Sequence, residues 1–407
     1  MGRIMDSLFK SKNAYLRNEI AAQNNRSLHV MPKLPLNSFC EEYYTEMHNT
    51  IISGGTGVNR ALVEYNFIQQ AQRLGLPVII LHAGNSFMKS GVGTSAGTGS
   101  IGYYDPIIGK DSDEVADLLT DLSSNLLQGK NELFGMWSLV MDILFIQNER
   151  VTLDSLVKFR CDRIPDILGE MTESNILSNS KRMEYINRYG AVSSCAHEAQ
   201  RLITKLKSYP LGDGYETAHS LDTVLAEGGI ASIDLISDTN DVLKEICFTD
   251  IDRIMRQGRQ FLLIVESLSF LKRDSHVDNV LLRNSGNMSL LFAANDVPAM
   301  TQESEEHFQT LVSGHTNIML LKHNSAVSAK KWSDYLGQHY VQQVDQSIGT
   351  SKENVSLLKK TNSTNITIKE ERRDILPSES IIRLLPHQSY VLEASERAII
   401  KVALPQI

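Results

Sequence analysis

The chain has 407 residues, of which 42% are hydrophobic and 22% charged, and its formal net charge is −8. This composition is that of an ordinary globular protein with two or more domains, or with one large α/β domain and an insertion. The negative charge excludes a generally basic nucleic-acid surface, but it does not exclude a local basic stripe or a basic pore. The four cysteines form no C-x-x-C pair, which predicts neither a disulfide framework nor a zinc site. No apolar run is long enough for a signal peptide or a membrane span.

The first 83 residues predict an arm followed by a βαβ unit. Residues 1–37 are polar and mixed and end in "MPKLPLN", which indicates an arm or short helix and then a linker. A short apolar run at 49–53 predicts a strand. Residues 60–75 show helical spacing of apolar residues, with Gly75 as the stop, and "LPVIILHA" (76–83) predicts a buried strand. Strand, glycine turn, helix and strand together predict a parallel sheet.

The pattern changes between residues 112 and 218, where helical periodicity dominates and long β-branched runs disappear. Strand patterns then return, at "MSLLFAAND", "TNIMLLK", "SYVLE" and "RAIIKVAL". We therefore expect an α/β fold whose mainly parallel sheet is interrupted by an all-α insertion. The expected parts are an N-terminal arm and linker (1–37), the first part of the core (38–111), the all-α insertion domain (112–218) and the second part of the core (219–407).

The glycine turn resembles the P-loop pattern G-x-x-x-x-G-K-[ST]. A P-loop holds phosphates with backbone N–H groups at a helix N-terminus, while its Lys reaches the β- and γ-phosphates and its Ser/Thr holds Mg²⁺. Asn59, Arg60 and Ala61 stand where the pattern has Gly, Lys and Ser/Thr. Asn59 tolerates a left-handed backbone and Arg60 keeps a positive charge, but Ala61 has no oxygen for a metal. The candidate nucleotide-binding residues are Gly54, Gly55, Thr56, Gly57, Val58, Asn59, Arg60 and Ala61.

A P-loop enzyme also needs acidic residues at the end of a second strand, and "FLLIVESLSFL" (261–271) is the candidate. Val265 occupies the position of the usual Asp that supports the metal, whereas Glu266, which would polarise the attacking water, is retained. Both motifs therefore lack a side-chain ligand for Mg²⁺, and no metal site is predicted. ATP is the candidate cofactor, with weak or lost binding and severely impaired hydrolysis. The alternative is that the turn is a chance glycine turn and that Glu266 simply ends a strand.

With these motifs in this order, residues 45–405 resemble the coupling proteins of bacterial conjugation and type IV secretion (TraD/TraG-like), in the FtsK–HerA branch of P-loop ATPases. The stretches that carry the resemblance are "IISGGTGVNRA", "YYDPIIGKDSDEVADLL", "LDTVLAEGGIASIDL", "FLLIVESLSFL", "LRNSGNMSLLFAANDVPAM" and "DILPSESIIRLLPHQSYVLEASERAIIKV". The resemblance implies a RecA-like ATPase core with an all-α domain, usually assembled as a hexameric ring. In the family this ring recruits relaxase-bound DNA or protein effectors to a secretion channel.

Further residues and partners follow from the resemblance. Asn295 is the nearest match to a Gln that the family carries near the end of the next strand, which makes it a candidate sensor. Arg283 could be an arginine finger presented to a neighbouring subunit, or a structural arginine. The implied partners are DNA or a relaxase or effector, secretion ATPases or channel components, and further subunits of a homo- or hetero-hexamer. We expect a cytoplasmic protein at the inner face of the membrane, with membrane contact only through a partner or through an anchor outside this sequence.

The leading hypothesis is a coupling-protein-like component with impaired hydrolysis that recruits substrate or fills a position in a mixed ring. Three alternatives stay open. The first is an active ATP-driven DNA-translocating motor that uses Arg60, Glu266 and atypical metal ligands. The second is a non-catalytic interaction scaffold unrelated to DNA. The third is the other large ATPase of the same secretion systems.

Overall fold

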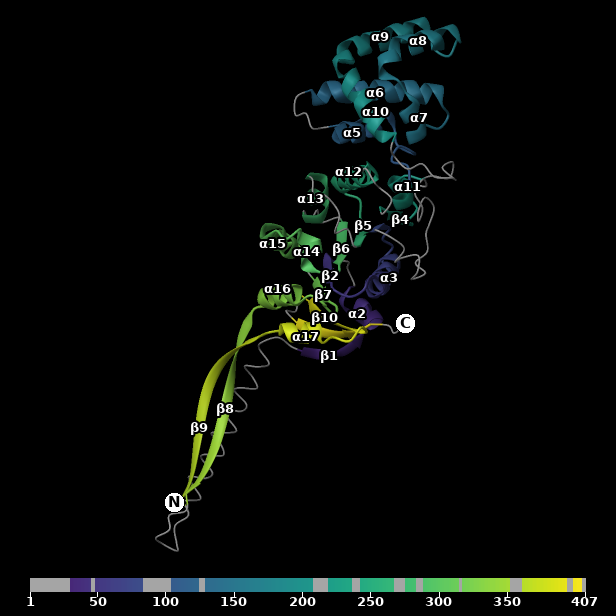
Figure 1. Cartoon of the computed structure of the whole chain (residues 1–407). Helices are drawn as coiled ribbons and strands as arrows, with labels where there is room; N and C mark the ends of the chain where they lie inside the picture. The colour runs from purple at the N-terminus through teal and green to yellow at the C-terminus, as the bar shows by residue number, and fades with distance from the viewer. Residues whose placement is uncertain are drawn as a thin grey trace. The chain divides into compact units, whose positions relative to one another are not determined.

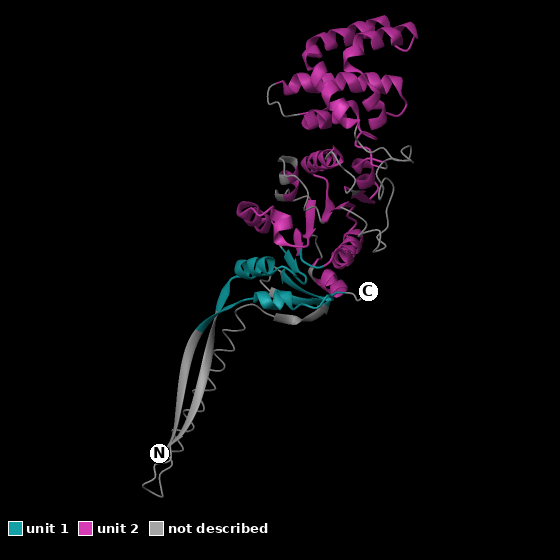
Figure 2. Cartoon of the chain, in the orientation of Figure 1, with its two compact units in different colours: residues 1–35, 53–55, 317–407 teal, residues 36–52, 56–316 magenta. Residues whose placement is uncertain are grey.

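The computed structural model describes residues 30–44, 48–82, 104–123, 129–207, 219–235, 242–266, 275–282, 288–314, 317–351, 361–393 and 398–404, and Figure 1 labels their helices and strands. The chain divides into two compact units (Figure 2). Unit 1 contains residues 1–35, 53–55 and 317–407, and unit 2 contains residues 36–52 and 56–316. The glycine turn is therefore shared, because residues 53–55 belong to unit 1 and the chain from Thr56 onward belongs to unit 2.

The strands of unit 2 lie in the order β2-β6-β5-β3-β4. Their bounds are β2 (Thr50–Ser53), β3 (Val78–His82), β4 (Ile230–Asp234), β5 (Phe261–Glu266) and β6 (Met288–Ala294). β3 pairs in parallel with β4 and β5, and β5 pairs in parallel with β6. Every residue of β3 and β5 is buried, as is typical of parallel strands that helices cover on both faces. The predicted α/β fold with a mainly parallel sheet is confirmed.

The helices that accompany this sheet include the predicted one after the glycine turn. They are α2 (Leu36–Tyr43), α3 (Gly57–Arg73), α11 (Leu221–Ala226), α12 (Val242–Arg256), α13 (Ser275–Leu282), α14 (Val297–Thr301) and α15 (Glu305–Ser313). α3 begins three residues before the predicted start at Arg60, because the Thr56 side chain caps the helix at that point. It ends just before Gly75, whose positive φ of 72° stops the helix as predicted.

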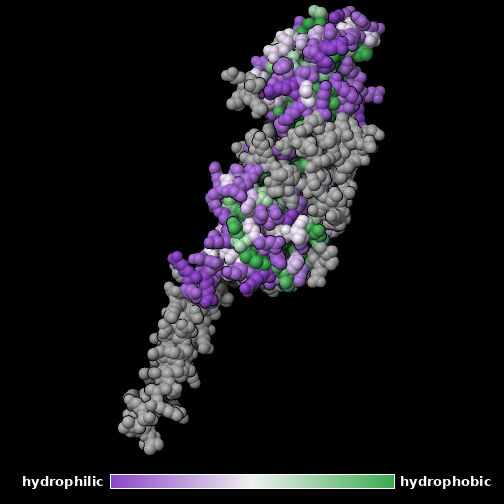
Figure 3. Space-filling model, in the orientation of Figure 1, coloured by the Kyte–Doolittle hydropathy of each residue, from purple (hydrophilic) through white to green (hydrophobic). Residues whose placement is uncertain are grey.

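The helical segment, residues 112–206, contains only helices and turns in its described part. Its helices are α5 (Ser112–Ser123), α6 (Lys130–Gln147), α7 (Leu153–Lys158), α8 (Ile164–Glu173), α9 (Asn179–Val192) and α10 (Ala196–Leu206), with short 3₁₀ turns at Cys161–Arg163 and Ser193–Cys195. The core lies along α6, where Trp137 and its neighbours are fully buried. On the face that Figure 3 shows, the described surface of this segment is mostly hydrophilic with scattered hydrophobic residues. The predicted boundaries at 111 and 218 stay predictions, since the unit division does not mark them.

None of the helices in the described residues combines the length and the apolar character that a membrane span requires.

The strands of unit 1 lie in the order β1-β11-β10-β7. Their bounds are β1 (Val30–Pro35), β7 (Asn317–Leu320), β10 (Gln388–Glu393) and β11 (Ala398–Ala403), and the helices α16 (Ala326–Leu336) and α17 (Ser378–Ile382) accompany them. β1 corrects a prediction, because its residues were assigned to a linker. It pairs in parallel with β11 and ends the strand order, and such an edge strand tolerates the two prolines that indicated a linker.

A long β-hairpin, β8 (Gln338–Ser351) with β9 (Thr361–Asp374), extends from unit 1 (Figure 1). The two strands form a separate antiparallel sheet that is in register over their whole length, from Gln338↔Asp374 to Ser351↔Thr361. This hairpin was not predicted from the sequence. Its strands are rich in Gln, Asn, Ser and charged residues and therefore lack the apolar runs by which the other strands were found.

Candidate functional site

The glycine turn begins at Gly54, where only glycine fits. Gly54 and Gly55 both have positive φ, 97° and 69°, a region that residues with a side chain rarely occupy. A Cβ on Gly54 would lie 2.7 Å from Nδ1 of His323 and 2.9 Å from the carbonyl oxygen of Leu321. The backbone of the turn thus lies directly against the His323 ring within unit 1.

A buried hydrogen-bonded chain in unit 1 holds His323 in place. Its Nδ1 lies 2.8 Å from the carbonyl oxygen of Leu321, which can only accept, so Nδ1 carries a proton. Nε2 lies 2.9 Å from Oγ of Ser53, which in turn accepts a hydrogen bond of 2.8 Å from the Trp332 indole. A neutral imidazole that carries its proton on Nδ1 has an unprotonated Nε2, so the Ser53 hydroxyl donates to Nε2. All three side chains are buried, so this end of the turn is held by protein groups alone.

Several amides of the turn are engaged by the protein itself. In unit 1, the N–H of Gly55 donates to the carbonyl oxygen of Lys322 over 2.9 Å. In unit 2, Thr56 and Asn59 form a capping box: the N–H of Asn59 donates to Oγ1 of Thr56 (3.2 Å), and the N–H of Thr56 donates to Oδ1 of Asn59 (3.4 Å). Asn59 lies in the first turn of α3, so its tolerance of a left-handed backbone is not used. A phosphate would have to displace these bonds to use the same amides.

Arg60, at the position of the P-loop lysine, pairs with Glu266 at the end of β5. Its Nε and Nη2 donate to Oε1 of Glu266 over 3.0 and 2.9 Å. The two side chains are 5% and 1% exposed, so the ion pair is buried. The two residues are 206 positions apart in the sequence, and the fold brings them together. The candidate phosphate ligand of one motif thus pairs with the candidate catalytic carboxylate of the other. Each neutralises the charge that the other would offer to a nucleotide or a water.

A second carboxyl group, that of Glu64, is buried on the same face of α3, one turn after Arg60. Neither of its oxygens has a hydrogen-bond partner among the described residues. Burial raises the pKa of Glu64 well above its usual range, the negative Glu266 raises it further, and the Arg60 guanidinium offsets this only in part. Burial therefore favours the protonated, neutral form of Glu64.

The remaining predicted residues add no metal ligand. Ala61 and Val265 are fully buried apolar residues, and the described part of the chain contains no group of His, Cys, Asp or Glu that could hold a metal ion. Asn295, the candidate sensor, is exposed and follows β6, whose Ala293 is in register with Glu266. Arg283 lies outside the described residues, so its role as a finger stays a prediction.

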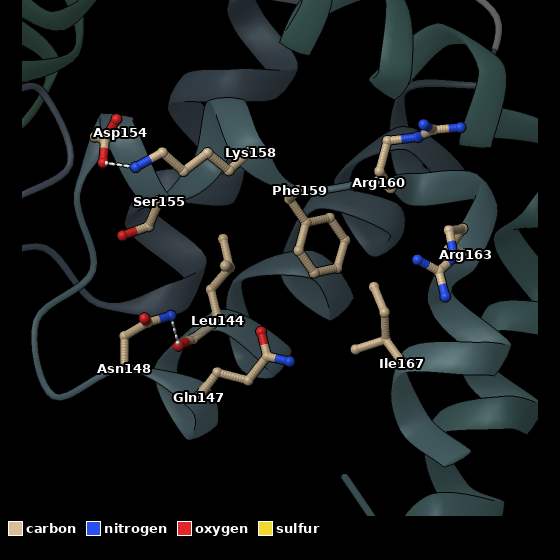
Figure 4. A pocket seen from close by; sticks show the side chains of 10 residues that line it. All are labelled: Leu144, Gln147, Asn148, Asp154, Ser155, Lys158, Phe159, Arg160, Arg163 and Ile167. Carbon is tan, nitrogen blue, oxygen red and sulfur yellow. Dashed lines mark hydrogen bonds and ion pairs between the residues drawn. The ribbon is translucent and has the colours of Figure 1, made fainter. Parts of the chain in front are cut away.

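A cavity of about 430 Å³ lies in the helical segment between α6, α7 and α8 (Figure 4). The Phe159 ring is among the residues that line it, and Lys158 turns back to an ion pair with Asp154. The two lining arginines also have carboxylate partners, Arg160 with Asp162 and Arg163 with Glu170. Because every cation at this cavity is paired, it offers no ready site for a phosphate.

Glu64 and His323 were not predicted as site residues from the sequence. A signal for Glu64 was present: it lies four residues after Arg60 and three before Phe67, within the buried stripe of α3. An acidic residue at such a position predicts a buried partner or a raised pKa. His323 carries no comparable signal, because its contact with Gly54 depends on chain segments that are far apart in the sequence.

No protein-family model matches the chain, and no curated protein matches its sequence. Solved structures do match. The unbound bacterial conjugative coupling protein TrwB, in its ΔN70 form, superposes with a TM-score of 0.52 and 14% identity, over 88% of this chain and 84% of that one. The chain has the fold of a conjugative coupling protein. The predicted resemblance and the RecA-like P-loop fold are thereby confirmed at the level of the fold.

Two further TrwB structures agree with this assignment. The sulfate complex of the ΔN70 form matches with a TM-score of 0.51 and 13% identity, over 93% of this chain and 96% of that one. TrwB in complex with ADP and Mg²⁺ matches with a TM-score of 0.50 and 14% identity, over 88% and 84%. This second TrwB structure holds a nucleotide and a metal.

Proposed function

We propose that this chain is a coupling-protein-like component of a conjugative or type IV secretion system in which the nucleotide site has become a structural ion pair. It recruits DNA or a protein substrate, or fills a position in a mixed ring, without hydrolysing ATP at a useful rate. The fold supports the first half of this proposal. The buried pair between Arg60 and Glu266 carries the second.

The physical argument rests on what a nucleotide would have to displace. To reach a phosphate, Arg60 must leave Glu266, which then stays buried next to Glu64 without its counter-ion. Breaking a buried ion pair by removing one partner costs about 3–5 kcal/mol. The capping box and the bond from Gly55 to Lys322 would add further losses. With no side-chain ligand at Ala61 or Val265, a metal offers little in return.

The partners follow from the same proposal. The family resemblance of the sequence implies DNA or a relaxase or effector protein as the substrate, and secretion ATPases or channel components as neighbours. A ring of six subunits, homo- or hetero-hexameric, at the inner face of the membrane would let a non-hydrolysing chain act beside active ones. Deleting the gene in its host and measuring plasmid transfer or secretion tests this role.

The wild-type protein and one double variant separate a structural site from a catalytic one. The wild-type protein is titrated with a fluorescent ATP analogue, with and without Mg²⁺, and its ATP hydrolysis is measured. We expect a Kd weaker than about 1 mM and no turnover above background. The double substitution Arg60→Met with Glu266→Met should complement the gene deletion as well as the wild type does. Loss of transfer in a folded double variant would contradict the proposal.

An active motor is the second candidate, because Glu266 is retained and the same fold has been solved with ADP and Mg²⁺ in TrwB. In that case hydrolysis would be robust and metal-dependent, and Glu266→Gln would abolish it while nucleotide binding persists.

A further inference from the structure

Two stretches of chain join the helical segment to the sheet of unit 2, and they lie side by side. We call them the neck: residues 104–111 lead into the segment and residues 219–222 lead out of it. Tyr104 forms a parallel bridge with His219, and the N–H of Asp105 donates to the carbonyl oxygen of His219 over 3.0 Å. The buried carboxylate of Asp105 also accepts the N–H of Leu153, the first residue of α7, over 2.8 Å. The neck is therefore bonded to itself and to the segment.

Four charged side chains lie at the neck, two positive and two negative; three are buried and Asp222 is partly buried. Nζ of Lys110, whose side chain is fully buried, lies 2.7 Å from Asp222 and 3.4 Å from Asp250. Arg253 donates to both carboxylates: its Nη2 and Nε lie 3.1 and 3.2 Å from Oδ1 of Asp250, and Nη2 also donates to Oδ2 of Asp222. Tyr104 donates a further hydrogen bond of 2.9 Å to Asp250. Lys110, Asp222, Asp250 and Arg253 form the neck cluster.

Two members of the neck cluster, Asp222 and Arg253, have pKa values shifted in favour of their ionised forms. Burial alone would raise the pKa of Asp222, but the cations of Lys110, Arg253 and Arg259 outweigh it, and the pKa lies below its usual value. The pKa of Arg253 is raised for the matching reason: the carboxylates of Asp250 and Asp222 outweigh its burial. Removing one member of such a cluster leaves a buried charge without its partner.

Two members of the cluster come from α12, which binds the helical segment at two more points. Arg256 donates to Asp121 of α5 over 2.6 Å, and Glu245 forms an ion pair with Lys205 of α10. After α12 the chain makes a tight turn at Gly258, with φ of 76°, and enters β5, whose last residue is Glu266. α12 thus links the helical segment to the strand that ends in the candidate site.

We propose that the neck cluster is a charge lock that makes the helical segment and α12 move as one rigid body, so that the neck does not act as a hinge. A displacement of the helical segment, whatever binds it, is then carried into α12 and β5. This inference does not rest on the proposed function, because it concerns the mechanics of unit 2 and uses no nucleotide chemistry.

Hydrogen–deuterium exchange of the full chain tests the lock. Asp250→Asn should speed exchange at least tenfold in peptides that cover α5 and residues 219–226, and leave β3 unchanged. The control is Arg163→Met, which breaks an exposed ion pair with Glu170 in the same segment and should change neither peptide. Unchanged exchange at the neck in Asp250→Asn would overturn the proposal, as would an equal increase in β3, which would indicate global destabilisation.

A milder variant covers the case in which Asp250→Asn does not fold. Arg256 is half exposed, and Arg256→Met removes its bond to Asp121 of α5 together with its longer contacts to Asp252 within α12. The lock predicts faster exchange in α5 and no change in β3. Equal exchange in wild type and Arg256→Met would show that the bond to Asp121 does not hold α5 against α12, which contradicts the rigid body that we propose.

Discussion

The buried pair of Arg60 and Glu266 makes a quantitative prediction about stability. Arg60→Met should lower the free energy of unfolding by about 3–5 kcal/mol, because it leaves the carboxylate of Glu266 buried without a counter-ion. Glu266→Met should have a comparable effect, since it leaves the guanidinium buried. The double variant should return to within about 1 kcal/mol of the wild type, because two apolar side chains of similar volume need no counter-charge.

Urea unfolding at pH 7 measures all four proteins of this cycle, and α3 itself supplies the control. Arg73 forms an ion pair with Glu41 in which both side chains are more than half exposed. Arg73→Met should therefore cost less than about 1 kcal/mol. If Arg60→Met costs no more than Arg73→Met, or if the effects of Arg60→Met and Glu266→Met simply add, the pair is not the structural replacement that we infer.

Three further predictions concern the site and the helical segment. In the wild type, the free energy of unfolding should fall by about 1.4 kcal/mol per pH unit from near pH 4.5 up to the raised folded-state pKa of Glu64, because the unfolded chain releases a proton that the native state keeps. Glu64→Gln should remove this fall. Urea unfolding of both proteins from pH 4.5 to 8 measures it, and a difference between them that does not change with pH contradicts it. Gly54→Ala should lower the free energy of unfolding by about 1–3 kcal/mol through its positive φ alone, and by more through the contact of the new Cβ with His323. In thermal unfolding, the loss should therefore be smaller in a His323→Ala background than in the wild type. Equal losses in the two backgrounds refute the contact. The pKa of Asp121 is lowered, because Lys130 and Arg256 outweigh its burial. The stability that the ionised Asp121 gives to the fold is therefore complete above about pH 3.8 and is lost as the pH falls through the folded-state pKa. Asp121→Asn should abolish this part of acid unfolding, and an unchanged acid transition speaks against it.

The sequence predicted the parallel sheet because its strands are continuous apolar runs with turn residues at their ends. "LPVIILHA" and "FLLIVE" became β3 and β5, which pair with each other in register from Val78↔Leu262 to His82↔Glu266. The helical segment was predicted from its periodicity. Two elements were missed for a physical reason: β1 contains prolines, and β8–β9 is polar, so neither shows the pattern of a buried strand.

The candidate site was predicted in its parts but not in its geometry. The residue types identified Arg60 as the remaining charge of the first motif and Glu266 as that of the second. Their spacing of 206 residues cannot show that the two side chains meet in a buried ion pair. The early start of α3 was hidden as well, because the capping box at Thr56 depends on a side-chain bond to Asn59 rather than on hydrophobic periodicity.

A crystal structure grown with ATP and Mg²⁺ would test the central claim most directly. The account predicts that Arg60 stays within hydrogen-bonding distance of Glu266, that the Thr56–Asn59 capping box stays closed, and that no coordinated cation is present at Ala61 and Val265. A triphosphate held by the turn from Gly54 to Arg60, with Mg²⁺ coordinated and Arg60 released from Glu266, would contradict it.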